Sequence, residues 1–215
     1  MLRLHDPTTG RPEPIPPGPV HIHVAAGAER SFITADLLQR VAGRAGHRPV
    51  RVTRAPGIEP VEARFDDYNI AVPEVVTSVP GGAIQIDLPE ADENWITLVG
   101  NAGCDFLCVR LATLRTRHTA PPDLGDDLLW RSQLDLERWR RLVAGWATAP
   151  GRPINRVYSA EAEAALFDDL DSPTALAVLE RLADDPDVAP GAKLETIIHL
   201  DLLLGLNLVA DIGRS

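Results

Sequence analysis

Hydrophobic positions follow two different periods along this chain, and the period changes near residue 103. In the first half, the apolar runs at 20–26 and 50–53 predict two short β-strands. Between them, the apolar residues of 32–45 share one face of a helix that begins after Ser31 and stops at Gly46. Together these three segments predict a β-α-β unit. The proline-rich segment 12–19 ahead of them predicts extended, non-helical chain.

Residues 55–100 contain further strand-like segments, separated by proline and glycine. We expect strands at 70–73, 83–88 and 95–99, and the sequence leaves the order of their pairing open.

From Cys104 onward the apolar residues recur every three to four positions, which predicts helices. Leucines at 107, 111 and 114 mark the first helix, and apolar residues of 136–146 mark the second. Asp171 is the expected N-cap of a third helix that has Pro173 in its first turn, and the last helix ends at Gly205. The pattern therefore predicts an α/β part at 1–103 followed by an α-helical domain at 104–215.

Composition narrows the class of protein. The chain has 215 residues, 45% hydrophobic and 24% charged, which is enough to bury a sizeable core. The net charge of −10 is opposite to that of a general nucleic-acid binder. We find no apolar run near the roughly 18 residues that span a membrane, and no apolar signal segment at the start. We therefore expect a cytoplasmic protein with no membrane partner.

Three segments of the second half, in order, resemble cysteinyl-tRNA synthetases. They are 105–118 followed by Asp-Asp-Leu-Leu at 126–129, the segment 164–179 with Asp-Asp-Leu-Asp-Ser-Pro, and Leu-Leu-Gly-Leu-Asn-Leu at 203–208. At the front, 4–10, 17–24 and 33–40 resemble the family's first nucleotide-fold strand and first long helix. The mycothiol-pathway cysteine ligase is the nearest sister. The resemblance covers 2–54 and 105–208, and it implies a truncated Rossmann-like sheet followed by a helical bundle, with no anticodon-binding domain.

The chain lacks the residues that carry out each step of the family's chemistry. The family's zinc-binding cysteine corresponds to Ala25 or Ala26 here, and no pair of histidines follows in 27–32. The lysine-rich loop expected before Asp105 is also missing, since Lys193 is the only lysine in the sequence. Preference for arginine over lysine through a GC-rich genome is an alternative reason for the missing lysines. We expect neither a metal nor another cofactor, and no cysteinyl-adenylate formation.

Three functional hypotheses follow from these losses. The first is a pseudo-enzyme that binds a protein partner, a second copy of itself or a small ligand in the old nucleotide cleft. The second is an ATP-dependent ligase with a rebuilt site, which requires a pocket near 25–30 lined by arginines and carboxylates. The third is a tRNA acceptor-stem binder without catalysis, which requires a positive stripe through Arg110, Arg115, Arg117, Arg131, Arg138, Arg140 and Arg141.

Two groups of residues are candidates for binding. Ala26, Gly27, Glu29 and Arg30 lie at a strand-to-helix junction, the usual ligand edge of an α/β sheet, although an ordinary surface turn explains them as well. The resemblance places Arg115, Arg117 and His118 at the family's turn near the tRNA acceptor stem, where they would contact phosphate. Favourable cations at a helix C-terminus are the alternative explanation for this second group.

Other residues that suggest chemistry have simpler explanations. His21 and His23 share one strand face but have no third ligand, so we expect solvated histidines on an edge strand. Cys104 and Cys108, four residues apart on a helix, are expected to be packed thiols. Helix packing is expected of Trp130, Trp139 and Trp146, and helix capping of Asp168, Asp169 and Asp171.

Overall fold

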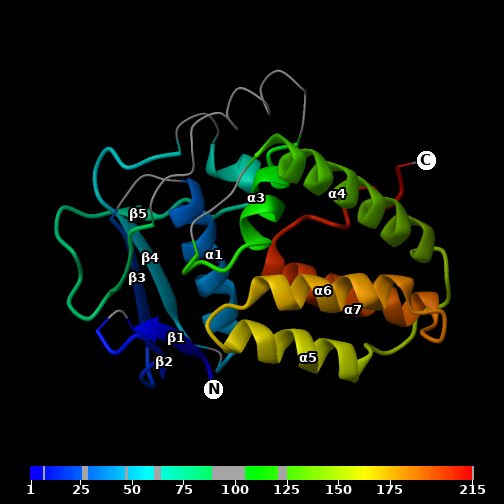
Figure 1. The fold of residues 1–215 in the computed structure, drawn as a ribbon, viewed down its shortest axis with the longest axis horizontal. Coiled ribbons are helices and arrows are strands. Elements are labelled where there is room, and N and C mark those ends of the chain that lie inside the picture. The colour runs from blue at the N-terminus through cyan, green and yellow to red at the C-terminus, as the bar shows by residue number, and fades with distance from the viewer. Residues whose placement is uncertain are drawn as a thin grey trace.

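Helix α1 (Glu29–Arg44) lies between a β-sheet and the helical half of the molecule (Figure 1). The computed structural model describes residues 1–6, 8–25, 29–46, 48–60, 64–88, 105–120 and 125–214. On one side α1 contacts β3 (Val20–Val24) and β4 (Val50–Arg54), and on the other α3 (Leu107–Leu114) and α7 (Pro190–Leu204). Because it is covered on both sides, every residue from 29 to 38 is buried.

The sheet is parallel and has the strand order β5-β4-β3-β6 in the described residues. β5 is Glu74–Val75 and β6 is Ile84–Ile86. Ile22 of β3 lies opposite Val52 of β4 and Ile84 of β6, and β3 is the interior strand with the fully buried Ile22 and Val24. This arrangement confirms the predicted α/β class and the β-α-β unit, since apolar runs are typical of buried parallel strands.

Some predictions for the first half are wrong, and others fall on undescribed residues. Residues 70–73 form no strand, because Ile70 enters the core directly after the 3-10 helix η1 (Phe65–Tyr68), with its backbone N–H bonded to Phe65 O at 2.9 Å. The expected strand 95–99 and the domain boundary at 103 lie outside the described residues.

Two of the prolines near the start, Pro12 and Pro14, belong to a β-hairpin that the sequence pattern did not predict. β1 (Arg3–Asp6) pairs antiparallel with β2 (Arg11–Pro14), and Leu4 lies opposite Glu13. Pro12 and Pro14 are tolerated there because β2 pairs on one side only within this two-stranded sheet.

The helical half contains α3, α4 (Asp126–Trp146), α5 (Arg156–Phe167), α6 (Ser172–Asp184) and α7. Asp171 caps α6 by accepting a hydrogen bond from the Thr174 N–H at 3.2 Å, and Gly205 ends α7 with φ 69°. Both helix ends are as predicted. Within the described residues, none of these helices is at once long and apolar enough to cross a membrane.

Candidate ligand cavity and the contacts that hold it

A cavity of about 1010 Å³ lies beside β6 and the start of β3. Four parts of the chain form its wall: the β1–β2 hairpin with the prolines after it, β6 with its flanks, the first turns of α1, and the turn after α3. The lining residues used below are Asp6, Glu13, Ile15, His21, Arg30, Thr34, Ala83, Ile84, Ile86, Asp87, Leu88, His118 and Ala120. Segments separated by more than 100 residues therefore meet at one concave site.

Arg30 joins helix α1 to the turn after α3. Its side chain lines the cavity and the residue is only 4% exposed. Nη2 donates hydrogen bonds to the carbonyl oxygens of Arg117 at 3.1 Å and His118 at 3.0 Å, and also to that of Ala120. Burial lowers the pKa of Arg30 from its ordinary value, but a guanidinium remains charged in proteins. The structure thus brings together Arg30, one of the ligand-binding candidates at 26–30 (the ligand group), with Arg117 and His118. The latter two belong to the tRNA-binding candidates Arg115, Arg117 and His118 (the tRNA group).

Aspartates bond the side chains of this turn, whereas Arg30 bonds its backbone. Arg117 forms an ion pair with Asp171, and His118 Nε2 lies 3.0 Å from Asp169 Oδ1. The neighbouring Arg115 bonds Asp135 at 2.5 Å. Each residue of the tRNA group therefore already has an aspartate partner within the protein.

The segment 168–171 ties the N-terminal hairpin to this turn. Asp169 Oδ1 accepts a hydrogen bond from the His5 N–H at 2.7 Å, and Asp168 pairs with Arg3 at 3.6 Å. Asp169 and Leu170 have φ values of 62° and 51°, a left-handed conformation that costs energy for residues other than glycine. The expected capping role is confirmed for Asp171, which caps the start of α6, and for Asp168, which is the C-cap residue of α5, while Asp169 forms long-range contacts instead.

Among the residues that the structure describes, the other candidates of the ligand group are not seen at the cavity. Glu29 is the first residue of α1 and is buried. Ala26 and Gly27 lie outside the described residues. The structure therefore places only Glu29 and Arg30 of this group, and only Arg30 lines the cavity.

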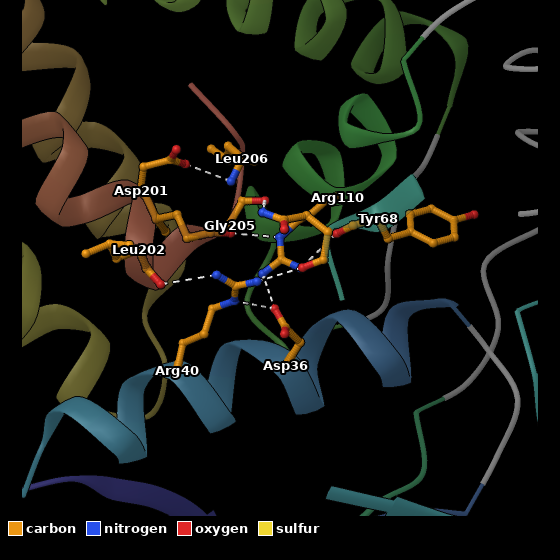
Figure 2. Close-up of polar contacts among 10 residues, drawn as sticks. Asp36, Arg40, Tyr68, Arg110, Asp201, Leu202, Gly205 and Leu206 are labelled. Carbon is orange, nitrogen blue, oxygen red and sulfur yellow. Dashed lines mark hydrogen bonds and ion pairs between the residues drawn. The ribbon is translucent and has the colours of Figure 1, made fainter. Parts of the chain in front are cut away.

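Arg110 is not a surface residue, so it was wrongly placed in the predicted positive stripe. It is fully buried on α3, and Figure 2 shows its contact with Asp36, in which Nη2 lies 2.6 Å from Oδ2. Its Nε donates to the carbonyl oxygen of Leu204 at 2.7 Å, and Nη1 to that of Tyr68 at 3.1 Å. Burial lowers the pKa of Arg110, and the charge of Asp36 opposes this effect.

Other residues complete the network around Arg110 (Figure 2). Arg40 Nε donates to Asp36 Oδ2 at 2.7 Å, so that carboxylate serves two guanidinium groups. Asp201 accepts hydrogen bonds from the Leu206 and Leu208 N–H groups, both at 2.8 Å, and its burial raises its pKa. The chain after α7 is thereby fixed against α3.

Two further arginines of the expected stripe are also paired. Arg138 bonds Glu180 and lies 3.3 Å from Asp184. Arg140 bonds Asp105 at 2.6 Å. Carboxylates therefore offset much of the positive charge that tRNA binding would use, and tRNA binding stays a prediction.

The expectation of two solvated histidines on an edge strand was wrong. β3 lies between β4 and β6, and His23 is 3% exposed with Nδ1 at 3.0 Å from Thr53 Oγ1. His21 lines the cavity. No cluster of three or more metal-binding side chains occurs in the part of the chain that the structure describes.

Buried cysteine, tryptophan and lysine side chains support the helices. Cys108 is fully buried on α3, and Cys104 lies outside the described residues. Trp139 is buried and bonds Glu180 at 2.6 Å, but Trp130 is 57% exposed, so its predicted packing role was wrong. Trp146 packs against the core and lies 5.4 Å from the ammonium of Lys193.

Lys193 itself has a structural role at the end of α6. Its Nζ donates a hydrogen bond to the Ala183 carbonyl oxygen at 2.8 Å, and the residue is 8% exposed. Because this carbonyl lies in the last turn of α6, the single lysine of the chain stabilises a helix end.

The contacts centred on Arg30 and Arg110 were not predicted from the sequence. The sequence does single out Arg110, because it is the one charged residue in the otherwise uncharged Leu107–Leu114. Such a position predicts a buried, paired charge, but nothing in the sequence identifies the partner. Arg30 left no comparable trace, since its acceptors are backbone carbonyl groups 87 to 90 positions away.

Comparison with known proteins identifies enzymes that ligate cysteine as partial homologues. No protein-family model matches the chain. The L-cysteine:1D-myo-inositol 2-amino-2-deoxy-alpha-D-glucopyranoside ligase of Salinispora arenicola is 36% identical over 111 residues, covering 48% of this chain and 25% of the ligase. The ligase of the same name from Cellulomonas flavigena is 33% identical over 114 residues, covering 49% and 26%.

A tRNA ligase is similar as well. The cysteine–tRNA ligase of Paracoccus denitrificans is 35% identical over 97 residues, covering 44% of this chain and 20% of that enzyme. All three relatives are members of the cysteinyl-tRNA synthetase family, so the predicted resemblance is confirmed for about half of the chain. The chain spans about a quarter of the length of the curated relatives it matches.

Proposed function

We propose that this cysteinyl-tRNA synthetase-like protein does not activate an amino acid with ATP, and that it binds a small molecule in the cavity beside β3 and β6. The cavity next to Arg30 is the observation that carries the proposal. Its volume of about 1010 Å³ corresponds to the upper end of small-molecule sites, roughly 300–1,000 Å³.

The charges around the cavity argue against ATP chemistry. Arg30 is the only lysine or arginine among its described lining residues, and Nη2 of Arg30 already bonds three carbonyl oxygens. Asp6, Glu13 and Asp87 add negative charge to the same wall. Cleavage of ATP needs cations held against the phosphates, so this balance of charges disfavours it.

The single lysine supports the same conclusion. Lys193 bonds Ala183 at the end of α6 and does not line the cavity. No other lysine exists in the sequence to act on a leaving pyrophosphate.

A ligase with a rebuilt site is the second candidate. The names of the relatives describe ligases that act on L-cysteine or cysteine. The cavity also lies where this hypothesis requires a pocket. It nevertheless lacks the convergent arginines that a rebuilt phosphate site would need, at least among the described residues.

A thermal-shift and calorimetric screen tests the proposal. Small acids, amines and neutral amphiphiles would be titrated into the whole chain, and into Ala83→Trp, which fills the cavity from its wall. We expect at least one compound to raise the melting temperature of the natural protein and not that of Ala83→Trp. If no compound discriminates between the two proteins, the cavity is not a small-molecule site.

A further inference from the structure

We infer that the cavity binds a small organic monocarboxylate, with its carboxylate held between Arg30 and Thr34. This inference rests on the proposed small-molecule function and names the chemical class of the ligand. Two observations support this inference. Arg30 and Thr34 are buried polar side chains of α1, and much of the remaining cavity wall is apolar.

Arg30 brings a buried positive charge to the cavity, and the described residues include no carboxylate paired with it. The residue is 4% exposed, and no described Asp or Glu forms an ion pair with it. Carbonyl oxygens bond only Nη2, so Nε and Nη1 have no acceptor among the described residues. A charge in a largely buried place is stabilised by an opposite charge, and a bound carboxylate would supply that charge and accept hydrogen bonds from Nε and Nη1.

Thr34 lies one helical turn after Arg30 and lines the same cavity. It is also 4% exposed, and its hydroxyl has no hydrogen-bond partner in the described part of the chain. Residues four apart share a helix face, so Thr34 and Arg30 present their donors to one volume. The N-terminal end of α1 adds its favourable dipole for an anion at this place.

The other lining residues determine which chemical body the ligand can carry behind its carboxylate. Ile15, Ile84, Ile86 and Leu88 are apolar and line the cavity, so a ligand with an apolar body gains by burying it there. Asp6, Glu13 and Asp87 line it too and repel ligands with several negative charges. A single carboxylate on an apolar body fits both conditions better than a polyphosphate does.

Calorimetric titration of the whole chain with octanoate, 1-octanol, octylamine and octyl phosphate tests this chemistry. All four probes share the apolar body, and their head groups are a carboxylate, a neutral hydroxyl, an amine and a phosphate. We expect octanoate to bind at least tenfold more tightly than any of the others. Equal or tighter binding of one of the other three would overturn the inference.

Two variants test the proposed contacts. Thr34→Val keeps the shape of the side chain and should weaken octanoate binding about ten- to a hundredfold, since it removes one hydrogen bond to a charged group. Arg30→Met should weaken it more than tenfold, and its circular dichroism spectrum and melting temperature would show whether the protein still folds. Thr148→Val, which lies outside the cavity lining, serves as the matched control and should bind normally.

The outcomes separate this inference from the proposed function. If octanoate binds to natural protein and to Thr34→Val with equal affinity, the assigned contact is wrong even though a ligand site exists. If an amine or a neutral probe binds in a way that Ala83→Trp abolishes, and octanoate does not bind, the cavity is a ligand site of a different class. If octanoate binds Ala83→Trp as well as the natural protein, it binds elsewhere and the inference fails.

Discussion

The guanidinium of Arg110 and the carboxylate of Asp36 form a fully buried ion pair, with 2.6 Å between Nη2 and Oδ2 (Figure 2). Arg110 belongs to 105–118 and Asp36 to 33–40, and Leu204, whose carbonyl oxygen accepts from Arg110 Nε, belongs to 203–208. These are three of the segments that carry the resemblance to cysteinyl-tRNA synthetases. The three segments meet at this ion pair, which joins helix α1, packed against the sheet, to the helical half.

Asp36→Asn should destabilise the protein strongly, by about 3–5 kcal/mol, because it leaves the charge of Arg110 buried without its partner. Urea unfolding followed by circular dichroism measures the change. Glu161→Gln is the matched control, since it breaks an ion pair with Arg181 in which both side chains are about half exposed. Similar losses in both variants would contradict the role assigned to the buried pair.

Gly205→Ala should cost more stability than a left-handed backbone alone explains. Gly205 has φ 69°, and a Cβ there would lie 2.6 Å from Arg110 Nη2. Gly57 has a similar φ of 78° with open space around it, so Gly57→Ala measures only the backbone cost of about 1–2 kcal/mol. We expect Gly205→Ala to exceed this value in urea unfolding, and equal values would show that Arg110 moves aside freely.

Lys193 should react slowly with amine-directed reagents in the native protein. Its ammonium is buried and bonds the Ala183 carbonyl oxygen, whereas the N-terminal Met1 is exposed. Mass spectrometry of peptides after brief labelling would give the two rates, and we expect urea to raise the rate at Lys193 while that at Met1 changes little. Lys193→Met should lose about 1–2 kcal/mol of stability through the lost hydrogen bond. Rapid native labelling of Lys193 would show that α6 ends differently.

The hydroxyl of Tyr158 should titrate at unusually high pH. It donates a hydrogen bond to Asp185 at 2.7 Å, and this contact raises the pKa of Tyr158 and lowers that of Asp185. Because the folded pKa of Tyr158 is raised, the contact stabilises the protein below about pH 10 and is lost as the pH rises through the folded value. For Asp185 the stabilisation is present above its unfolded pKa of about 3.9 and is lost on acidification.

Ultraviolet titration of the tyrosines checks this prediction. Asp185→Asn should bring the pKa of Tyr158 down towards its ordinary value, and Tyr158→Phe identifies which transition belongs to Tyr158. Asp184→Asn is the control, because Asp184 contacts Arg138 and not Tyr158. An unchanged transition in Asp185→Asn would contradict the hydrogen bond.

Local chemistry made parts of the fold predictable. Asp171 before Ser172 and Pro173 marked the start of α6, and Gly205 marked the end of α7, because caps depend on neighbours in sequence. Helix α5 was missed, since only Ser159, Ala162 and Leu166 of its residues are buried and its apolar face is weak.

The site was less predictable because its contacts are long-range. The sequence identified Arg30, Arg117 and His118 as separate candidates, but not that Arg30 bonds the backbone of the other two. It also could not show that Arg110 points inward while Trp130 points outward, because both choices depend on which elements pack together. Thr34 was not singled out, since a threonine inside a helix has no distinctive pattern.

The central claim is that this chain does not activate cysteine with ATP. Exchange of labelled pyrophosphate into ATP, measured with and without L-cysteine, tests it most directly when one of the related cysteine ligases is run alongside. We predict no exchange above the protein-free background under conditions in which the related ligase is active. Cysteine-dependent exchange by the natural chain, lost in Arg30→Met, would contradict the account.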